Sequence, residues 1–198
     1  MKKIGITKRR NMKVGLLGGA FNPAHDGHIY ISELALKLLN LDEVWWLVTP
    51  QNPLKNSKAN NLEKRLKYAK KIIKNSRIII DALETKYKNN YTANTLNTII
   101  NQFKGTNFIW LMGADNLSEI NKWYKWNYIF QLMPIAVFDR EDYSYSVFNS
   151  IAGKRYYNKL YKTKNSVSIF NKKLPSWKFL RINKNLLSST KIRNEKSI

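Results

Sequence analysis

The stretch KVGLLGGAFNPAHDGH, residues 13–28, decides the fold of this chain. It opens with the short apolar run Lys13–Leu17, which predicts a buried β-strand, and Gly18-Gly19 then predict a tight turn. From Gly27 to about Asn40 apolar side chains recur at helical spacing, so an α-helix follows the turn. A strand that passes through a glycine turn into a helix is the first half of a β-α-β unit.

The same alternation continues along the chain. Further strands are predicted at 44–48, 77–80, 107–112, 135–138 and 177–182, and further helices at 62–74, 92–103, 120–132 and 188–195. Alternating strands and helices predict an α/β fold with a doubly wound parallel sheet and a small C-terminal helical portion. Ligands of such sheets bind beyond the carboxyl ends of the strands. We expect a single domain over residues 12–198, preceded by an N-terminal extension, residues 1–11.

The charge of the chain is strongly positive, with 35 Lys and Arg against 13 Asp and Glu, a formal net charge of +22. Such a field attracts polyanions, so nucleic acid has to be considered as a partner. The lysines are scattered over nearly the whole chain, however, and the Lys- and Asn-rich composition is that of an AT-rich genome, which argues against a nucleic-acid surface. The chain has no cysteine and no apolar run near the roughly 20 residues that cross a bilayer. A soluble cytoplasmic protein without a membrane partner is expected.

Both histidines of the chain, His25 and His28, lie where the predicted helix begins. Backbone N–H groups at a helix N-terminus favour anions, and two histidines three residues apart can donate hydrogen bonds to one phosphate group. Gly27 leaves room for a base or sugar to approach the backbone. A single histidine here would more often cap the helix or pack in the core. Two of them in one glycine-flanked turn indicate a phosphate site.

A second phosphate-binding segment is predicted near the other end of the chain, at Leu187–Arg193 (LSSTKIR). Ser188, Ser189 or Thr190 can cap a helix, and Arg193 then lies about one turn further on. Hydroxyl groups at a helix N-terminus beside an arginine suit a polyphosphate. An ordinary capped C-terminal helix would show the same residues, so this segment alone does not establish a phosphate site.

Residues 18–28 resemble the GGxFNPxHxGH signature of the bacterial nicotinate-nucleotide adenylyltransferases, members of the HxGH nucleotidyltransferase superfamily. The match covers every fixed position of the signature: Gly18, Gly19, Phe21, Asn22, Pro23, His25, Gly27 and His28. LSSTKIR is similar to the ISSTxIR motif of that family, with Leu187 in place of the first isoleucine. The resemblance runs from about Met12 to Glu195, is weakest over 141–175, and implies a Rossmann-like nucleotidyltransferase fold.

Intermediate segments resemble the family's substrate motifs. Thr49–Lys55 (TPQNPLK) is similar to its P-x-x-P-x-K-like loop, which implies Lys55 at the substrate. Tyr91–Leu96 (YTANTL) is similar to its YT-x-x-TL segment, where a threonine, here Thr92, and backbone amides meet the nicotinate carboxylate.

Two further segments concern the ribose and the pyridine ring. In Gly113–Asn116 (GADN) the resemblance implies that Asp115 contacts ribose. Trp123 and Trp126 are similar to the family's W-x-x-W segment. Trp123 is the better candidate to stack on the pyridine ring, because an aromatic face suits a flat heterocycle. Trp126 is expected to pack or to gate.

The resemblance implies transfer of AMP from ATP to nicotinate mononucleotide, giving nicotinate adenine dinucleotide and pyrophosphate. His25 and His28 would be the catalytic residues, at the α- and β-phosphates. The other ATP-binding residues would be Gly18, Gly19, Phe21, Gly27, Ser189, Thr190 and Arg193; the mononucleotide would meet Asn22, Lys55, Thr92, Asp115 and Trp123. Mg²⁺ would enter through the ATP phosphates, with no dedicated protein metal site.

Other functions remain open at this point. Pantetheine-phosphate adenylyltransferases carry a G-x-F-D-P-x-T-x-G-H motif, from which Asn22 and His25 depart, and they lack a counterpart of YTANTL. Nicotinamide mononucleotide is an alternative acceptor, although the Thr92 segment favours a carboxylate. A basic nucleic-acid-binding protein is the alternative from another class. It gives no reason for two histidines in a glycine turn. The oligomeric state is left undetermined.

Overall fold

The computed structural model describes residues 10–50, 61–82, 91–139, 146–163 and 167–181 of the chain. Within these ranges a six-stranded sheet forms the centre, and its strands are parallel throughout. The strands are β1 (Lys13–Gly19), β2 (Glu43–Val48), β3 (Ile78–Asp81), β4 (Asn107–Gly113), β5 (Ile135–Phe138) and β6 (Trp177–Leu180). The sequence-based prediction of a parallel α/β sheet is therefore confirmed.

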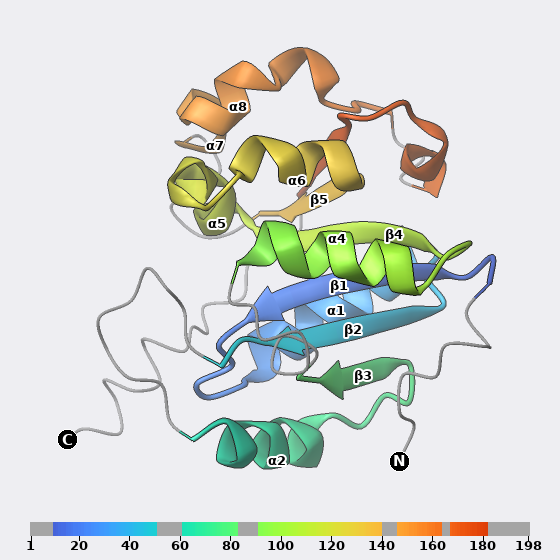
Figure 1. Cartoon of the computed structure of the whole chain (residues 1–198), viewed down its shortest axis with the longest axis vertical. Coiled ribbons are helices and arrows are strands. Elements are labelled where there is room, and N and C mark those ends of the chain that lie inside the picture. The colour runs from blue at the N-terminus through green and yellow to red at the C-terminus, as the bar shows by residue number, and fades with distance from the viewer. Residues whose placement is uncertain (1–9, 51–60, 83–90, 140–145, 164–166, 182–198) are drawn as a thin grey trace.

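The order of the strands is β3-β2-β1-β4-β5-β6, so the chain builds one half of the sheet outward from β1 and then returns to build the other (Figure 1). This is the doubly wound order, whose topological switch point lies between β1 and β4. Both neighbours of β1 are in register with it, Leu16 beside Trp45 of β2 and Trp110 of β4. The carboxyl ends of β1 and β4, where a ligand is expected, thus lie side by side.

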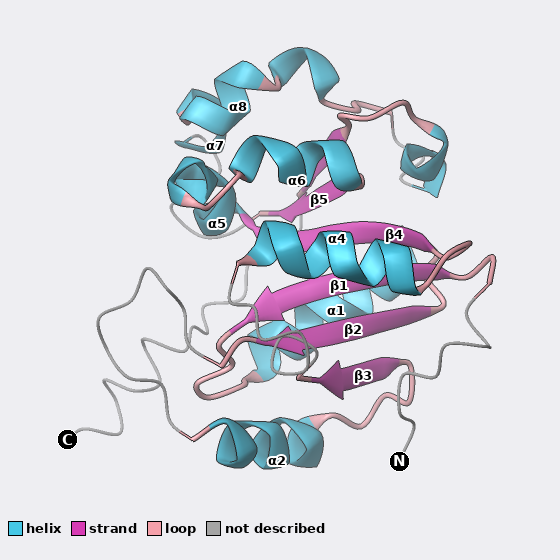
Figure 2. Cartoon of the chain, in the orientation of Figure 1, coloured by secondary structure: helices cyan, strands magenta, loops and turns pink. Residues whose placement is uncertain are grey.

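Helices cover both faces of the sheet, as Figure 2 shows. They are α1 (Asp26–Leu38), α2 (Leu62–Ile72), α4 (Thr92–Gln102), α5 (Ala114–Glu119), α6 (Trp126–Leu132), α7 (Ser146–Asn149) and α8 (Ile151–Arg155), with 3₁₀ turns η2 (Ile120–Lys122), η3 (Tyr157–Lys159) and η4 (Val167–Asn171). In Figure 1, α4 lies in front of the sheet and α1 behind it. None of the helices in the described ranges has the length and apolar character needed to span a bilayer.

Two apolar cores hold these layers together, one on each face of the sheet. The first joins α4, α5 and α6 to side chains such as Trp45 and Trp110, and the second joins α1 and α2 to side chains such as Trp46 and Leu111. Successive residues of a strand point to opposite faces, which is why neighbouring Trp45 and Trp46 belong to different cores. Both tryptophans are fully buried.

The structure corrects the helix that was predicted over 120–132. That range contains the short turn η2, a break, and α6. The break lies at Trp123, whose backbone is extended, and at Lys125, which adopts the left-handed conformation at φ 49°. The indole of Trp123 packs against the first core, so tertiary contact outweighs the local helical pattern. The structure also adds α5, α7 and α8, which were not predicted. The predicted helix 188–195 lies outside the described residues.

Candidate active site

The turn between β1 and α1 is supported by aromatic packing. Phe21 has φ 45°, a left-handed conformation that is uncommon for a side chain of this size, and its ring is 2% exposed. The ring stacks on Trp46 of β2, with ring centroids 4.7 Å apart and an interplanar angle of 13°. Burial of two large aromatic faces stabilises this unusual backbone and fixes the path of the chain toward His25.

His25 and His28 lie together at the amino end of α1, with ring centroids 3.9 Å apart. His25 is the N-cap residue, and its Nδ1 accepts a hydrogen bond of 3.1 Å from the N–H of Gly27. The Nδ1 of His28 accepts a hydrogen bond of 3.2 Å from the N–H of His25. Because Nδ1 is an acceptor in both rings, each neutral imidazole carries its proton on Nε2. The turn thus presents two N–H donors beside the positive end of a helix dipole, a favourable arrangement for phosphate.

A buried hydrogen-bond chain connects His28 to the sheet. The Oγ–H of Ser32 donates to the backbone oxygen of His28 at 2.7 Å, and the Nε1–H of Trp46 donates to Ser32 Oγ at 2.8 Å. Ser32 is fully buried. The ring of His28 also lies 4.7 Å from that of Phe21 and 5.8 Å from that of Trp46. These contacts restrict the first turn of α1 and hence the direction of the His28 ring.

The glycines of this turn have different surroundings. A Cβ at Gly18 would lie 2.4 Å from Cη2 of Trp110, so Trp110 already occupies that space. A Cβ at Gly19 would lie 3.4 Å from the ring of Phe21, an ordinary contact. Gly27 is buried in the first turn of α1. Gly18 therefore has a packing role in addition to the ATP-binding role predicted for it, and that ATP-binding role stays a prediction.

Arg65 of α2 was not predicted from the sequence, although it is the most deeply buried cation of the described chain, 3% exposed. Its guanidinium donates to the backbone oxygens of Ala20 at 2.5 Å, Thr49 at 2.8 Å and Pro50 at 2.7 Å. Burial lowers the pKa of Arg65 below its usual value. The signal available in the sequence is its position four residues before Ala69, on the inward face of an amphipathic helix.

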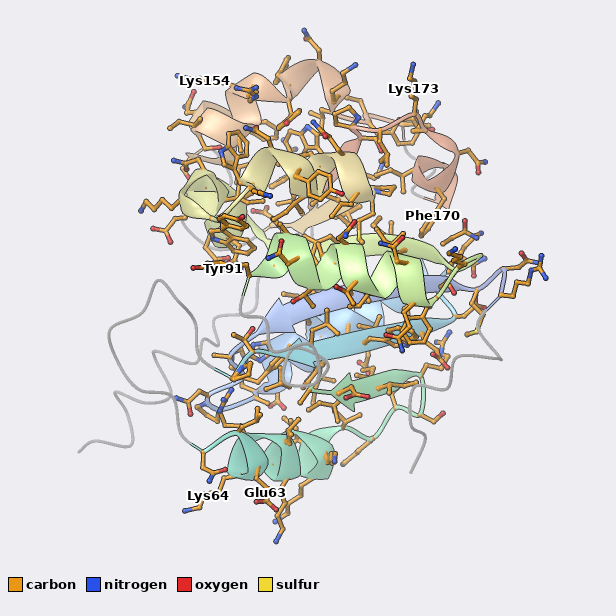
Figure 3. The ribbon with its side chains drawn as sticks, in the orientation of Figure 1. Glu63, Lys64, Tyr91, Lys154, Phe170 and Lys173 are labelled. Atoms are coloured by element: carbon orange, nitrogen blue, oxygen red, sulfur yellow. The ribbon has the colours of Figure 1, made fainter. Side chains whose placement is uncertain are left out.

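Three of the predicted mononucleotide residues, Thr92, Asp115 and Asn22, lie on segments at the carboxyl end of the sheet. Thr92 is the first residue of α4, and the N-cap residue Tyr91 makes no side-chain cap hydrogen bond. In Figure 3 Tyr91 lies at the end of α4 toward which β1 and β2 run. Asp115 follows β4 by two residues, in the first turn of α5, and its Oδ1 is buried. Asn22 Oδ1, in the β1–α1 turn, is buried as well.

The two tryptophans of the predicted W-x-x-W segment differ in their environment. Trp123 is partly buried at the edge of the first core, in the break between η2 and α6. Trp126 packs edge-on against Phe130 and Tyr156, with centroids 6.2 Å and 5.9 Å away, and lies under the guanidinium of Arg155. Packing therefore accounts for Trp126. Four predicted site residues, Lys55, Ser189, Thr190 and Arg193, lie outside the described ranges.

Comparisons with known proteins identify the family and the fold. The cytidylyltransferase-like family model matches residues 16–195. The probable nicotinate-nucleotide adenylyltransferase of Agrobacterium fabrum is 40% identical over 184 residues, which cover 92% of this chain and 98% of that protein. That of Rhizobium johnstonii is 39% identical over 189 residues, 95% of either chain. The solved structure of Plasmodium falciparum nicotinic acid mononucleotide adenylyltransferase complexed with NaAD has a TM-score of 0.70 at 17% identity, over 92% of this chain and 83% of that one, a likeness of fold.

Proposed function

This chain belongs to the nicotinate-nucleotide adenylyltransferase family, and from that premise we propose that it transfers the adenylyl group of ATP to nicotinate mononucleotide. The products are nicotinate adenine dinucleotide and pyrophosphate. The observation that carries the proposal is the pair His25 and His28. His25 Nδ1 accepts from the N–H of Gly27 and His28 Nδ1 accepts from the N–H of His25, so both rings carry their proton on Nε2 at one helix N-terminus.

The reaction needs no nucleophile from the protein. An oxygen of the mononucleotide 5′-phosphate attacks the α-phosphorus of ATP and forms a new P–O bond. The bond from that phosphorus to the oxygen bridging to the β-phosphate breaks, and pyrophosphate leaves with the electron pair. Negative charge builds up on the α-phosphoryl oxygens and on the leaving group, where His28 and His25 donate hydrogen bonds. Catalysis then consists of positioning and electrostatic stabilisation.

Besides Asn22 and Lys55, the mononucleotide is assigned to the elements that follow β3 and β4. The uncapped amino end of α4, with the Thr92 hydroxyl, suits the nicotinate carboxylate, because N–H groups and the helix dipole favour an anion. The ring of Trp123 would stack on the pyridine, and Asp115 would accept hydrogen bonds from ribose hydroxyls. Specificity for the acid over the amide would reside at Thr92.

Mg²⁺ is proposed to enter the site with ATP. Within the described ranges there is no group of three or more His, Cys, Asp or Glu side chains that could hold a metal ion, and the two histidines are already placed to donate hydrogen bonds rather than to ligate. Mg²⁺ prefers oxygen ligands and retains waters, so phosphate oxygens fit it better than this turn does. When bound, it neutralises charge on the triphosphate.

One assay tests the function directly. Pyrophosphate release from ATP and Mg²⁺ is measured with nicotinate mononucleotide, nicotinamide mononucleotide and phosphopantetheine in parallel, and the dinucleotide product is identified by chromatography. Release should be fastest with nicotinate mononucleotide. Faster release with phosphopantetheine, or none with either pyridine nucleotide, would contradict the proposal, and a preference for the amide would contradict the role given to Thr92.

A further inference from the structure

We propose that Arg65 is a positioning residue that holds the β1–α1 turn and Thr49-Pro50, directly after β2, at a fixed distance, so that the two substrates meet in line. This inference rests on the proposed function. Arg65 would touch neither substrate. It would act through the backbone oxygens of Ala20, Thr49 and Pro50, to which its guanidinium donates.

The geometry joins two segments that are distant in the sequence. Ala20 belongs to the turn that carries the histidines, whereas Thr49 and Pro50 directly follow β2. They begin the stretch for which the resemblance implies a contact of Lys55, outside the described residues, with the mononucleotide. The same two segments are also joined by the N–H of Thr49, which donates to Gly19 O at 3.0 Å. A planar guanidinium has five N–H donors in a rigid fork, so three carbonyls bound to it are fixed relative to one another.

The arginine also orients a peptide plane in the catalytic turn. In a trans peptide the C=O and the following N–H point in opposite directions. The carbonyl of Ala20 is directed at Arg65, and the N–H of Phe21 therefore points away from it. Arg65 thus sets the local backbone immediately before the buried ring of Phe21, against which His28 packs at 4.7 Å.

Burying an arginine at this position carries a cost in stability. Taking a guanidinium out of water is costly, and burial lowers the pKa of Arg65. An apolar side chain would fill the inward face of α2 beside Ala69 without that cost. An apolar residue, however, could not bind three carbonyl oxygens. The residue type is therefore explained by the positions of the carbonyls, which define the spacing of two substrate segments.

In-line transfer is sensitive to this spacing. The attacking oxygen must approach the α-phosphorus to about 3–3.5 Å, and a displacement of about 1 Å can lower the rate by roughly 10²-fold. Looser segments would still bind each substrate, because the binding groups themselves remain. The expected signature of an Arg65 variant is thus a slower chemical step with little change in either binding constant.

The test compares Arg65→Lys and Arg65→Met with Lys64→Met as the matched control. Lys64 is the preceding residue of α2, is exposed, and points away from the sheet in Figure 3. The dissociation constants of ATP and nicotinate mononucleotide are measured separately, the single-turnover rate is measured with both, and thermal unfolding monitors the fold.

Arg65→Lys keeps the positive charge but replaces the planar guanidinium, with its five N–H donors, by a compact ammonium group. We expect its single-turnover rate to fall roughly 10- to 100-fold, with each dissociation constant within about 3-fold of wild type. Lys64→Met should match wild type throughout.

Several results would overturn the inference. A wild-type rate in folded Arg65→Lys would show that the spacing does not depend on the fork. A large rise in one dissociation constant would make Arg65 a substrate ligand instead. Failure of both Arg65 variants to fold would assign it to stability. The proposed function is judged separately, on the wild-type chain: an inactive wild type refutes the function, whereas an active wild type with an equally active Arg65→Lys refutes only the positioning role.

Discussion

Replacing Gly18 by alanine should destabilise the protein, because the new methyl group has no space. Its Cβ would lie 2.4 Å from Cη2 and 3.1 Å from Cζ2 of Trp110, a residue 3% exposed in the first core. Trp110 Nε1 has no hydrogen-bond partner within the described part of the chain, so the ring is held by packing and must shift as a whole. Overpacking of this kind costs about 1–3 kcal/mol. Alanine also lowers the conformational entropy of the unfolded chain relative to glycine, which stabilises the folded protein by about 0.4–1 kcal/mol.

At the midpoints of these two ranges the net loss is about 1.3 kcal/mol, which for a chain of this size lowers Tm by roughly 3–5 °C. Gly19→Ala is the matched control, since its Cβ would meet Phe21 at an ordinary 3.4 Å. Its Tm should stay within about 2 °C of wild type, whatever it does to turnover. Adding Trp110→Phe, which removes Cη2, should relieve the clash, so the double variant should lose less stability than the sum of the single variants. Equal Tm losses at Gly18 and Gly19, or strict additivity with Trp110→Phe, would refute the reasoning.

Other predictions concern His28, the proposed pyridine site and a buried lysine. His28→Ala should lower kcat by roughly 10²-fold or more, as loss of one transition-state donor does, and near-normal turnover would remove His28 from catalysis. Trp123→Ala should raise KM for nicotinate mononucleotide and leave KM for ATP unchanged, whereas Trp126→Ala should chiefly lower Tm. If Trp123→Ala leaves KM for nicotinate mononucleotide unchanged, Trp123 does not stack on the pyridine ring. Burial lowers the pKa of Lys178, partly opposed by Tyr161, so between that pKa and the ordinary value of about 10.4 the unfolded chain binds more protons and stability rises with pH. Lys178→Met should flatten this rise in urea titrations from pH 7 to 10, and parallel profiles for the two proteins would contradict it.

The strands could be predicted from the sequence because each is an apolar run that fills one of the two cores. Where the prediction failed, the deciding contact was tertiary. Nothing in Trp123–Lys125 marks a break by glycine or proline, and the helix stops because Trp123 packs on the first core. The short α5 was missed because only Ala114 and Leu117 are buried in it, too few for a periodic pattern. The strand order depends on which way each connection turns, which composition and spacing do not encode.

The candidate site was partly predictable for a similar reason. His25 and His28 are conspicuous as the only histidines of the chain, and the structure brings them together. The backbone hydrogen bonds to their two Nδ1 atoms, from Gly27 and from His25, settle the tautomer and depend on the geometry of the first turn of α1. Arg65 was missed because its partners are backbone oxygens, and any residue type can supply a carbonyl. The close contact at Gly18 required knowing that Trp110 lies on the adjacent strand.

Because Trp45 and Trp46 are adjacent, burial of apolar surface alone does not distinguish the observed register of β2 from one shifted by a single residue. All residues of this strand are buried, and a slip by one residue would exchange the two faces while still placing one indole where another had been. The indole nitrogens remove the ambiguity. Trp45 Nε1 donates to Glu43 Oε2, on the same face of its own strand, whereas Trp46 Nε1 takes its acceptor, Ser32, from α1. A slip by one residue would place the Glu43 carboxylate on the face that α1 covers. It would also move Trp46 Nε1–H to the opposite face, away from Ser32, and each unsatisfied group costs about 1–3 kcal/mol. The Glu43 carboxylate and the Trp46 indole nitrogen thus specify the alignment of an otherwise apolar strand, and with it the position of α1, which carries His25 and His28.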